Sequence, residues 1–544
     1  MRRGNDSCSQ LRLVGGVWGP SKWLPLASGE HNIGAAFPAI MFIDRTNPLA
    51  STQPPNILWV CTDQQRYDTI GALGNRHVST PVIDELVATG TAFTHAYCQS
   101  PICTPSRASF LTGMYPSAVH VMGNGNDHFP DDAPPLVTRL LADAGYDCGL
   151  VGKLHLASAF GRVEPRTNDG YNYWKYSHAP RDDWQHGHDY ADWVREKGAV
   201  LGELTPYSQG VPADLHQTTW CAEMANQFMT ERMGGQPWLL SVNVYDPHPP
   251  FNPPAAYRKL FDPEQMPGPL FKASDLEQQG RLEAEGVDFQ SRARTPEMLD
   301  IKHPVAPASP GPGGGEQEVE ELADPISQRR DAKTLQAAYY AMIKLIDDSL
   351  ASMLNCLDET GQRENTVVIF TSDHGETLGD HGLIAKGCRF YEGLVRVPLI
   401  FRAPGRVREG IVDDSLVELT DLAPTLLDLA SIDMPHHIQG RSLAKRLAEQ
   451  VASPHRDHVR CEYYDALDEP DNSFATMWRD RRYKLVVYHG KSEGELYDLH
   501  EDPHEFQNLW HNSDYLETRL DLLRRSFDAS MLAMDRGPRR VGPM

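Results

Sequence analysis

Pro101 to Tyr115 reads Pro-Ile-Cys-Thr-Pro-Ser-Arg-Ala-Ser-Phe-Leu-Thr-Gly-Met-Tyr. The segment predicts a loop that leads into a helix, because Pro105 suits an early helical position, where its missing N–H is not needed, and Gly113 is a typical stop. A helix N-terminus has free N–H groups and the positive end of the helix dipole, so it favours anions. The pattern therefore places Cys103 at an anion-binding helix end, with Arg107 one turn further in. A buried cysteine beside a capped helix is the alternative.

Two apolar runs elsewhere in the chain each end in polar residues. Asn56 to Cys61 and Thr366 to Phe370 read as buried strands. Asp63-Gln64 follows the first run, and Asp373-His374 follows the second. Open α/β sheets place their sites at the carboxyl ends of strands, so these four residues are candidates for one site. Taken alone, Asp63-Gln64 would be better interpreted as a strand-end cap or turn.

Further candidate residues follow two other predicted strands. Cys148 to Val151 leads into Lys153 and His155, which strand periodicity puts on the same side. One can neutralise an anion and the other can carry a proton. His248 lies between prolines that hold its loop extended, which would fix the imidazole. Lys386 follows the second Asp-His segment. By themselves, each of these residues would be interpreted as an ordinary surface or loop residue.

Composition limits the function further. The 544 residues are 40% hydrophobic and 23% charged, enough for a large core and more than one domain. A net charge of −23 argues against general nucleic-acid binding but leaves room for a local basic pocket. The nine cysteines lack Cys-x-x-Cys spacing, so neither a zinc ribbon nor a disulfide framework is indicated. No apolar run approaches the roughly 20 residues of a membrane span. We expect a soluble, cytoplasmic protein; an export signal starting at Arg2-Arg3 is the alternative.

The chain divides into three predicted parts. Residues 1–53 form an N-terminal extension without clear periodicity, and residues 54–455 form a catalytic domain of alternating strands and helices. Within that domain, residues 262–330 are rich in Pro, Gly and acidic residues and predict a flexible excursion, which could serve as a lid or as a contact within a homo-oligomer. Residues 456–544 form a smaller subdomain, with a terminal helix and short antiparallel strands at Phe474–Trp478, Tyr483–Tyr488 and Glu495–Leu499.

Cys-Thr-Pro-Ser-Arg followed by Leu-Thr-Gly resembles the signature of the type I sulfatases, in the alkaline-phosphatase-like superfamily. Ser-Asp-His-Gly-Glu at residues 372–376 and Gly-Lys-Leu-His at residues 152–155 resemble further motifs of that family. The resemblance covers roughly residues 54–510. It implies an α/β fold, with a central mostly parallel sheet flanked by helices and a smaller C-terminal antiparallel sheet. It also implies that Cys103 is oxidised after translation to formylglycine by a formylglycine-generating enzyme.

The resemblance implies a role for each matching residue. The implied ligands of one divalent cation are Asp63, Gln64, Asp373 and His374. The implied catalytic residues are Cys103, Arg107, Lys153, His155, His248 and Lys386. Asn124 matches a substrate-contacting asparagine of some relatives. Oxygen donors with at most one nitrogen favour Ca²⁺, Mg²⁺ or Mn²⁺ over structural zinc. His374 as the fourth donor leans towards Mn²⁺, and we expect Ca²⁺ or Mn²⁺ ahead of Mg²⁺.

The implied activity is hydrolysis of small-molecule sulfate monoesters, of the arylsulfatase type. Hydrated formylglycine attacks sulfur and forms a covalent sulfated enzyme. His248, with Lys386, protonates the leaving oxygen, and His155 then takes a proton from the remaining hydroxyl so that sulfate leaves. Arg107, Lys153 and the metal stabilise the negative charge.

Two alternatives remain open from the sequence. The first is a phosphonate monoester or phosphodiester hydrolase on the same scaffold. Relatives of that kind tend to carry Tyr and Thr where this chain has Lys153 and His155, so we rank the sulfatase first. They share Asp63-Gln64 and Asp373-His374 with this chain, so we also expect cross-activity. The second is a non-catalytic binding protein on this fold, which is disfavoured because every position that the chemistry needs is filled.

Overall fold

The computed structural model describes residues 54–180, 187–204, 210–301, 331–467, 472–535, 537 and 542. The predicted extension, residues 1–53, lies outside the described residues, and so does the Pro-Gly-rich stretch at residues 302–330. The domain boundary predicted between residues 455 and 456 stays a prediction, because Leu49–Met544 forms one compact unit.

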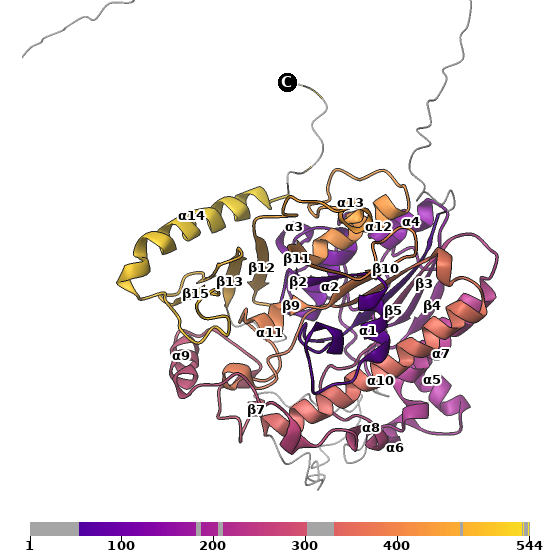
Figure 1. The fold of residues 1–544 in the computed structure, drawn as a ribbon, viewed down its shortest axis with the longest axis horizontal. Coiled ribbons are helices and arrows are strands. Elements are labelled where there is room, and N and C mark those ends of the chain that lie inside the picture. The colour runs from indigo at the N-terminus through magenta and orange to yellow at the C-terminus, as the bar shows by residue number, and fades with distance from the viewer. Residues whose placement is uncertain are drawn as a thin grey trace, which may run out of the picture. The chain divides into compact units, whose positions relative to one another are not determined.

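A nine-stranded sheet forms the centre of this unit (Figure 1). Its strand order is β11 (Ile411–Glu418), β2 (Thr91–Tyr97), β10 (Leu399–Arg402), β8 (Thr366–Ser372), β1 (Asn56–Thr62), β5 (Trp238–Asn243), β3 (Asp147–Gly152) and β4 (Tyr173–Tyr176), with β9 (Arg396–Val397) beside β2. β10 and β9 run antiparallel to their neighbours, and the other pairs are parallel. The predicted α/β fold with a mostly parallel sheet is confirmed.

Helices cover both faces of the sheet because its strands are apolar on both faces. On β1, Ile57 and Trp59 join one hydrophobic cluster, and Leu58 and Val60 join the other. The first cluster includes side chains from α2 (Cys103–Thr112), α4 (Val137–Asp143) and α12 (Leu422–Leu429). The second includes side chains from α1 (Pro81–Ala88), α5 (Asp189–Glu196), α7 (Gln217–Glu231) and α10 (Ala332–Glu359). None of the described helices combines the length and apolar character needed to cross a bilayer.

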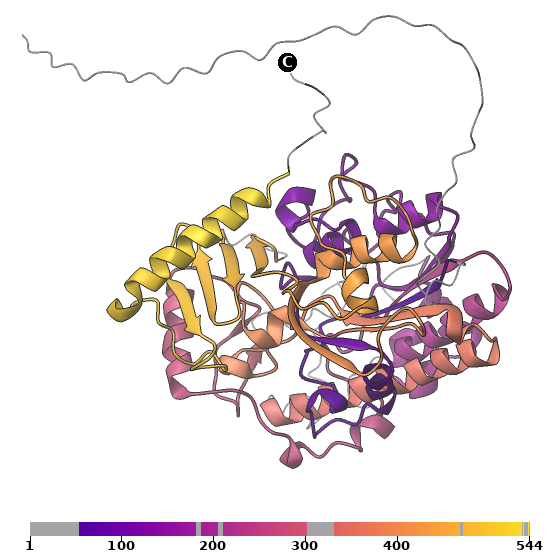
Figure 2. The same cartoon turned by 45° about the horizontal axis from the view of Figure 1, so that its top comes forward.

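A smaller antiparallel sheet follows near the C-terminus, as predicted. It consists of β12 (Val459–Tyr464), β13 (Phe474–Arg479), β14 (Tyr483–Tyr488) and β15 (Gly494–Asp498). The terminal helix α14 (Leu516–Leu532) lies along this sheet (Figure 2) and buries Leu522 and Ala529 against Trp478, Leu485 and Leu496. Shorter helices include α3 (Pro116–Val119), α6 (Leu201–Leu204), α8 (Ala255–Arg258), α11 (Glu392–Val395) and α13 (Ala444–Ala448).

The predicted flexible excursion is wrong for its first half. Residues 263–301 contain a 3-10 turn at Pro263–Gln265, the helix α9 (Ala273–Ala284) and a short ladder of β6 (Ser291–Arg292) with β7 (Asp300–Ile301). Gln278 Nε2 donates to Tyr497 Oη at 2.6 Å, and Gln279 Nε2 donates to Tyr391 Oη at 2.7 Å. Glutamines in a polar stretch suggest solvent exposure, but here both are buried. Their hydrogen bonds are long-range and leave no local pattern in the sequence.

Candidate active site

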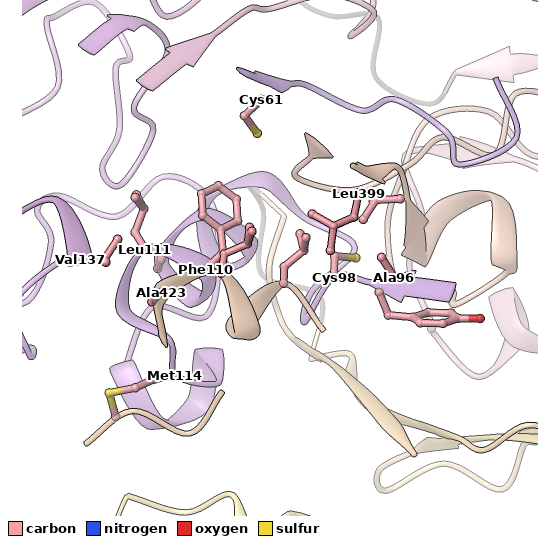
Figure 3. Close-up of a cluster of buried hydrophobic side chains, with 14 of the residues drawn as sticks. Cys61, Ala96, Cys98, Phe110, Leu111, Met114, Val137, Leu399 and Ala423 are labelled. Carbon is pink, nitrogen blue, oxygen red and sulfur yellow. The ribbon is translucent and has the colours of Figure 1, made fainter. Parts of the chain in front are cut away.

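Cys103 is the first residue of α2, and all ten residues of this helix are buried. Ile102 precedes it in an extended conformation, and Gly113 follows it with φ 71°, a left-handed conformation that costs glycine little. Phe110 and Leu111 anchor the helix in the hydrophobic cluster on this face of the sheet (Figure 3). The predicted helix is confirmed, and core packing fixes Cys103 at its anion-favouring end.

Asn124 contacts the same helix end. Its side-chain Oδ1 accepts a hydrogen bond from Thr104 N at 3.1 Å, so it satisfies one of the free N–H groups of the first turn. Asn124 is half-buried. The contact with substrate that the resemblance implies for Asn124 stays a prediction.

The two predicted strand ends meet beside Cys103. β1 and β8 are adjacent and parallel, with Thr62 opposite Ser372, so Asp63 and Asp373 leave the sheet side by side. Gln64 N donates to Asp373 Oδ1 at 3.0 Å and ties the two loops together. Ligand atoms that all lie within 4.8 Å of one another come from Asp63, Cys103, Asp373 and His374.

Two buried cations pair with these carboxylates. Arg107 Nε donates to Asp373 Oδ2 at 2.9 Å, and its Nη2 lies 3.5 Å from Asp63 Oδ2. Lys153 Nζ forms an ion pair with Asp63 Oδ2. Burial by itself raises the pKa of Asp63, but Lys153 and the other nearby cations hold it well below its usual value. The Asp63 carboxylate therefore stays available as a charged oxygen donor.

Lys386 links the remaining predicted residues to Cys103. Its Nζ donates to Cys103 Sγ at 2.7 Å and to Gln64 Oε1 at 3.1 Å. The same Nζ lies 3.2 Å from His248 Nε2. The amide oxygen of Gln64 and the imidazole of His248 therefore face the same small space as the cysteine.

The surroundings of Cys103 stabilise negative charge. Its Sγ lies 3.1 Å from His374 Nε2 and 3.7 Å from Asp63 Oδ1. Burial and Asp63 raise the pKa of the thiol, but Lys386, Lys153 and His374 outweigh them and lower it. A group at position 103 that carries or develops negative charge is therefore favoured.

The two candidate proton carriers are both neutral imidazoles. Burial lowers the pKa of His248 well below its usual value, and Lys386 lowers it further. Burial likewise lowers the pKa of His155, followed by Lys153. The His155 ring also packs edge-on against the ring of His178, with centroids 4.4 Å apart. Both imidazoles are therefore unprotonated near neutral pH.

Lys153 and His155 lie in a backbone conformation that differs from the predicted strand. β3 ends at Gly152, which has φ 95°, and His155 itself has φ 58°. The two residues therefore lie on a loop, and the same-side argument from strand geometry is wrong. The buried carboxylate of Glu164 holds this loop, since its two oxygens accept from His155 N at 2.8 Å and Leu156 N at 3.3 Å. Glu164 lies too far along the chain for a local pattern to reveal it.

Two further residues that the sequence did not assign hold Gln64 in place. Glu376 is buried and accepts hydrogen bonds from Gln64 Nε2, Leu378 N and Ala385 N. Burial raises the pKa of its carboxyl group. Tyr339 Oη donates to Gln64 O at 2.6 Å. Glu376 ends the Ser-Asp-His-Gly-Glu segment, so its position in that motif could have indicated a role in the site. Tyr339 fits the helical spacing of the core residues of α10, and nothing in the sequence distinguishes it from them.

The donor set suits a divalent cation. Asp63 and Asp373 are fully buried and supply carboxylate oxygens, the donors that Ca²⁺, Mg²⁺ and Mn²⁺ prefer. His374 Nδ1 lies 2.8 Å from Gly375 O, which leaves Nε2 for the centre of the site. Burial lowers the pKa of His374, but Asp373 and Cys103 raise it to about 9. A metal would compete with that proton for Nε2.

Comparisons with known proteins agree with this geometry. The sequence model of the sulfatase family matches residues 55–432, and that of the N-sulphoglucosamine sulphohydrolase C-terminal region matches residues 379–530. An arylsulfatase of Clostridium perfringens is 30% identical over 489 residues, which cover 87% of this chain and 93% of the relative. The multifunctional alkaline phosphatase superfamily protein PehA of Trinickia caryophylli is 28% identical over 529 residues, which cover 88% of this chain and 96% of the relative.

Solved structures share the fold. A phosphonate monoester hydrolase of Agrobacterium radiobacter superposes with a TM-score of 0.71 at 24% identity, covering 89% of this chain and 96% of the other. The mostly parallel sheet and the buried centre at its carboxyl edge fit the class to which the family match assigns the chain, the ester hydrolases of the alkaline-phosphatase-like superfamily. Within that superfamily, the chain belongs to the sulfatase family, the sulfuric ester hydrolases.

Proposed function

We propose that this protein hydrolyses sulfate monoesters of small molecules, with aryl sulfates as the substrates to assay first. The observation that carries the proposal is the position of Cys103 Sγ, 2.7 Å from Lys386 Nζ and 3.1 Å from His374 Nε2 at the start of α2. We further propose that a formylglycine-generating enzyme converts Cys103 to formylglycine. The aldehyde hydrate supplies two hydroxyls on one carbon, one to attack sulfur and one whose deprotonation expels sulfate.

Three cations of the chain surround the place where a sulfate group would lie. Arg107 and Lys153 are both 1% exposed, and Lys386 is 3% exposed. In such a water-poor site, fixed charges stabilise the transition state more than they would in bulk water. His248 and Asn124 are partly exposed, so we assign the substrate entrance and the leaving group to their side.

The proton transfers follow from the charge states. The pKa of Lys386 is raised, because Cys103 and Asp63 outweigh the opposing effect of burial. Lys386 is therefore the charged member of its pair with the neutral His248, and the two together donate a proton to the leaving oxygen. Conversion of Cys103 to an aldehyde removes one of the groups that raise the pKa of Lys386, which makes this lysine a stronger acid. The neutral imidazole of His155 accepts the proton of the second hydroxyl.

The chain would hold one divalent cation, Ca²⁺ or Mn²⁺, through Asp63, Gln64, Asp373 and His374. The bound ion would add positive charge next to the sulfate oxygens and lower the pKa of the attacking hydroxyl. The support for this ligand set is that two buried carboxylates, an amide oxygen and an oriented imidazole nitrogen converge there.

Metal binding is expected to stabilise the folded chain independently of turnover. A ligand at 100 times its Kd stabilises a native state by about 2.7 kcal/mol, so adding Ca²⁺ or Mn²⁺ to chelator-treated protein should raise the midpoint of thermal unfolding. Calorimetric melting checks this. Asp373→Asn should abolish the shift, and Asp413→Asn, which alters a carboxylate paired with Arg446 outside the site, should keep it. An equal shift in both variants would contradict the ligand set.

Glu376 is expected to tune metal affinity by orienting Gln64. In Glu376→Gln, the acceptor of Gln64 Nε2 loses its charge and presents an amide, so the Gln64 side chain is no longer held. Loss of such a supporting partner typically weakens metal affinity by about 10- to 100-fold. Titration of the apoprotein with Mn²⁺ measures the effect. Glu364→Gln alters an exposed glutamate away from the site and should bind Mn²⁺ like the wild type. An unchanged Kd in Glu376→Gln would remove Glu376 from the site.

The proposed substrate class is tested by comparing two leaving-group-matched esters. We expect higher kcat/KM for 4-nitrophenyl sulfate than for the 4-nitrophenyl ester of phenylphosphonate. The reason is that Lys153, which pairs with Asp63, adds a positive charge that suits a tightly held terminal sulfate group. The nearby His155 is neutral and adds no charge of its own. The similarity to PehA and to a phosphonate monoester hydrolase supports measurable activity on the second ester. A large preference for the phosphonate ester would contradict the proposal and favour a phosphonate monoester hydrolase instead.

A further inference from the structure

A second cavity lies at the opposite end of the helix that begins with Cys103. It has a volume of about 900 Å³, and Met114 and Tyr115, which follow the C-terminus of α2, form part of its wall. A ten-residue helix is about 15 Å long, so this cavity is separate from the catalytic centre. Figure 3 shows Met114 beyond the end of α2, on the side away from Cys61.

The wall of this cavity is rich in basic residue types. It contains three arginines and three histidines, and Asp535 is the acidic residue among the described residues that line it. The basic residues are Arg441, Arg456, Arg460, His436, His437 and His458. Arg456 Nη1 lies 2.7 Å from Glu418 Oε2, its Nη2 forms an ion pair with Asp421 Oδ1, and Arg460 Nη2 lies 2.9 Å from Glu462 Oε1. None of these three carboxylates lines the cavity, so they hold the two guanidinium groups in place from outside it.

Several buried donors in this wall have no acceptor within the described part of the chain. They are Arg456 Nε and both Nε and Nη1 of Arg460. Arg460 is 2% exposed and Arg456 is 7% exposed. A buried donor left without a partner costs about 1–3 kcal/mol, more when it is charged, so a structure that keeps three of them on two neighbouring arginines is suited to receive an anion.

Three arginines act on His458 in the cavity wall. Burial, together with Arg456, Arg460 and Arg441, lowers the pKa of His458 to about 4, opposed by Asp457. Guanidinium groups bind tetrahedral oxyanions through paired N–H donors. Ile438 and Leu532 also line the cavity and provide apolar surface.

We propose that this cavity binds an organic anion whose tetrahedral oxyanion head contacts the arginines and whose apolar body packs against Met114, Ile438 and Leu532. The cavity volume falls in the range typical of sites for molecules of that size, roughly 300–1,000 Å³. The wall also holds the end of α2, because Gln439 N donates to Gly113 O at 2.8 Å and Gln439 Oε1 accepts from Tyr115 N at 2.7 Å. An occupant therefore contacts the segment that terminates the helix of Cys103.

The first test locates the ligand. Crystals soaked in 4-bromobenzenesulfonate, which lacks a hydrolysable ester bond, should show an anomalous bromine peak beside Ile438 and Leu532 and sulfonate density beside the arginines. 4-Bromophenylphosphonate, soaked in parallel, tests a doubly charged phosphorus head, and occupancy by either probe supports the proposal. The probe that reaches the higher occupancy shows whether the cavity prefers a sulfonate or a phosphonate head group. Peaks confined to the catalytic centre with both probes would overturn it.

The second test measures affinity in solution. Arg441 is exposed, and its Nη1 donates only to His455 O, at 3.1 Å, among the contacts of the described residues. Arg441→Gln should therefore fold normally and keep kcat. Its affinity for 4-bromobenzenesulfonate at this site should fall by about tenfold or more, the effect of losing a charged donor. Arg525→Gln removes an equally charged side chain paired with Asp521 on α14 and should bind like the wild type. Equal affinity in the two variants, or inorganic sulfate binding as tightly as the organic probe, would refute the proposal.

Discussion

Cys103→Ala is expected to lower kcat for 4-nitrophenyl sulfate by about 10⁴-fold or more. Removing the nucleophile of an enzyme that works through a covalent intermediate has effects of about this size. The helix itself should be unaffected, because alanine suits a helix and the packing of Phe110 and Leu111 remains. Stopped assays at high enzyme concentration measure the residual rate, and circular dichroism checks the fold.

Matched variants separate the nucleophile from a general effect of losing a cysteine. Cys356 is another free, buried cysteine, on α10 beside Asn226, and Cys356→Ala should keep wild-type kcat. Cys103→Ser provides one hydroxyl without a second, so it should accept sulfate once and then stall. Mass spectrometry of Cys103→Ser after incubation with substrate should show the sulfated protein. Steady turnover by Cys103→Ser at the wild-type rate would contradict the proposed role of a diol.

Lys386→Met is expected to lower kcat by about 10² to 10³-fold, the usual effect of losing one group that stabilises transition-state charge. Methionine keeps most of the buried side-chain volume while removing the cation that contacts Cys103 and His248. If Lys386 also helps to protonate the leaving oxygen, the loss should be larger for an alkyl sulfate than for 4-nitrophenyl sulfate, whose leaving group needs no proton. Steady-state kinetics with the two esters measures this difference.

The control for this variant is a lysine of the surface. Lys445→Met alters an exposed residue of α13 and should leave both rates unchanged. If Lys386→Met lost the same factor with both esters, Lys386 would act only through its charge, and the proton would come from elsewhere. A rate equal to that of the wild type would remove Lys386 from the mechanism.

Most of the fold could be predicted because its signals are local. The apolar runs of β1 and β8 are bounded by polar residues, and the periodicity of α10 extends over many turns. The same locality explains the failure at residues 263–301. There, α9 is held by Gln278 and Gln279, whose partners lie more than 100 residues away. A polar residue that is buried by distant partners cannot be distinguished by pattern from one in solvent.

The candidate site also contains residues that could be predicted from local motifs and residues that could not. The residues that the family motifs name converge beside Cys103, since β1 and β8 are neighbours in the sheet. The residues that hold them are Glu164, under the His155 loop, and Glu376, under Gln64. Glu164 belongs to no motif, and Glu376 ends the Ser-Asp-His-Gly-Glu motif without a role that the sequence assigns. Their buried carboxylates are recognisable only once the long-range contacts are known. The loop geometry after Gly152 was missed for the same reason, because left-handed backbone conformations interrupt strand periodicity there.

The chemical state of residue 103 tests the central claim most directly. Protein should be purified from hosts with and without a formylglycine-generating enzyme, and the peptide containing residue 103 quantified by mass spectrometry beside the specific activity towards 4-nitrophenyl sulfate. We predict that activity rises in proportion to the aldehyde fraction and extrapolates to zero when only the thiol is present. Full activity in protein that carries only unmodified cysteine at position 103 would contradict the account.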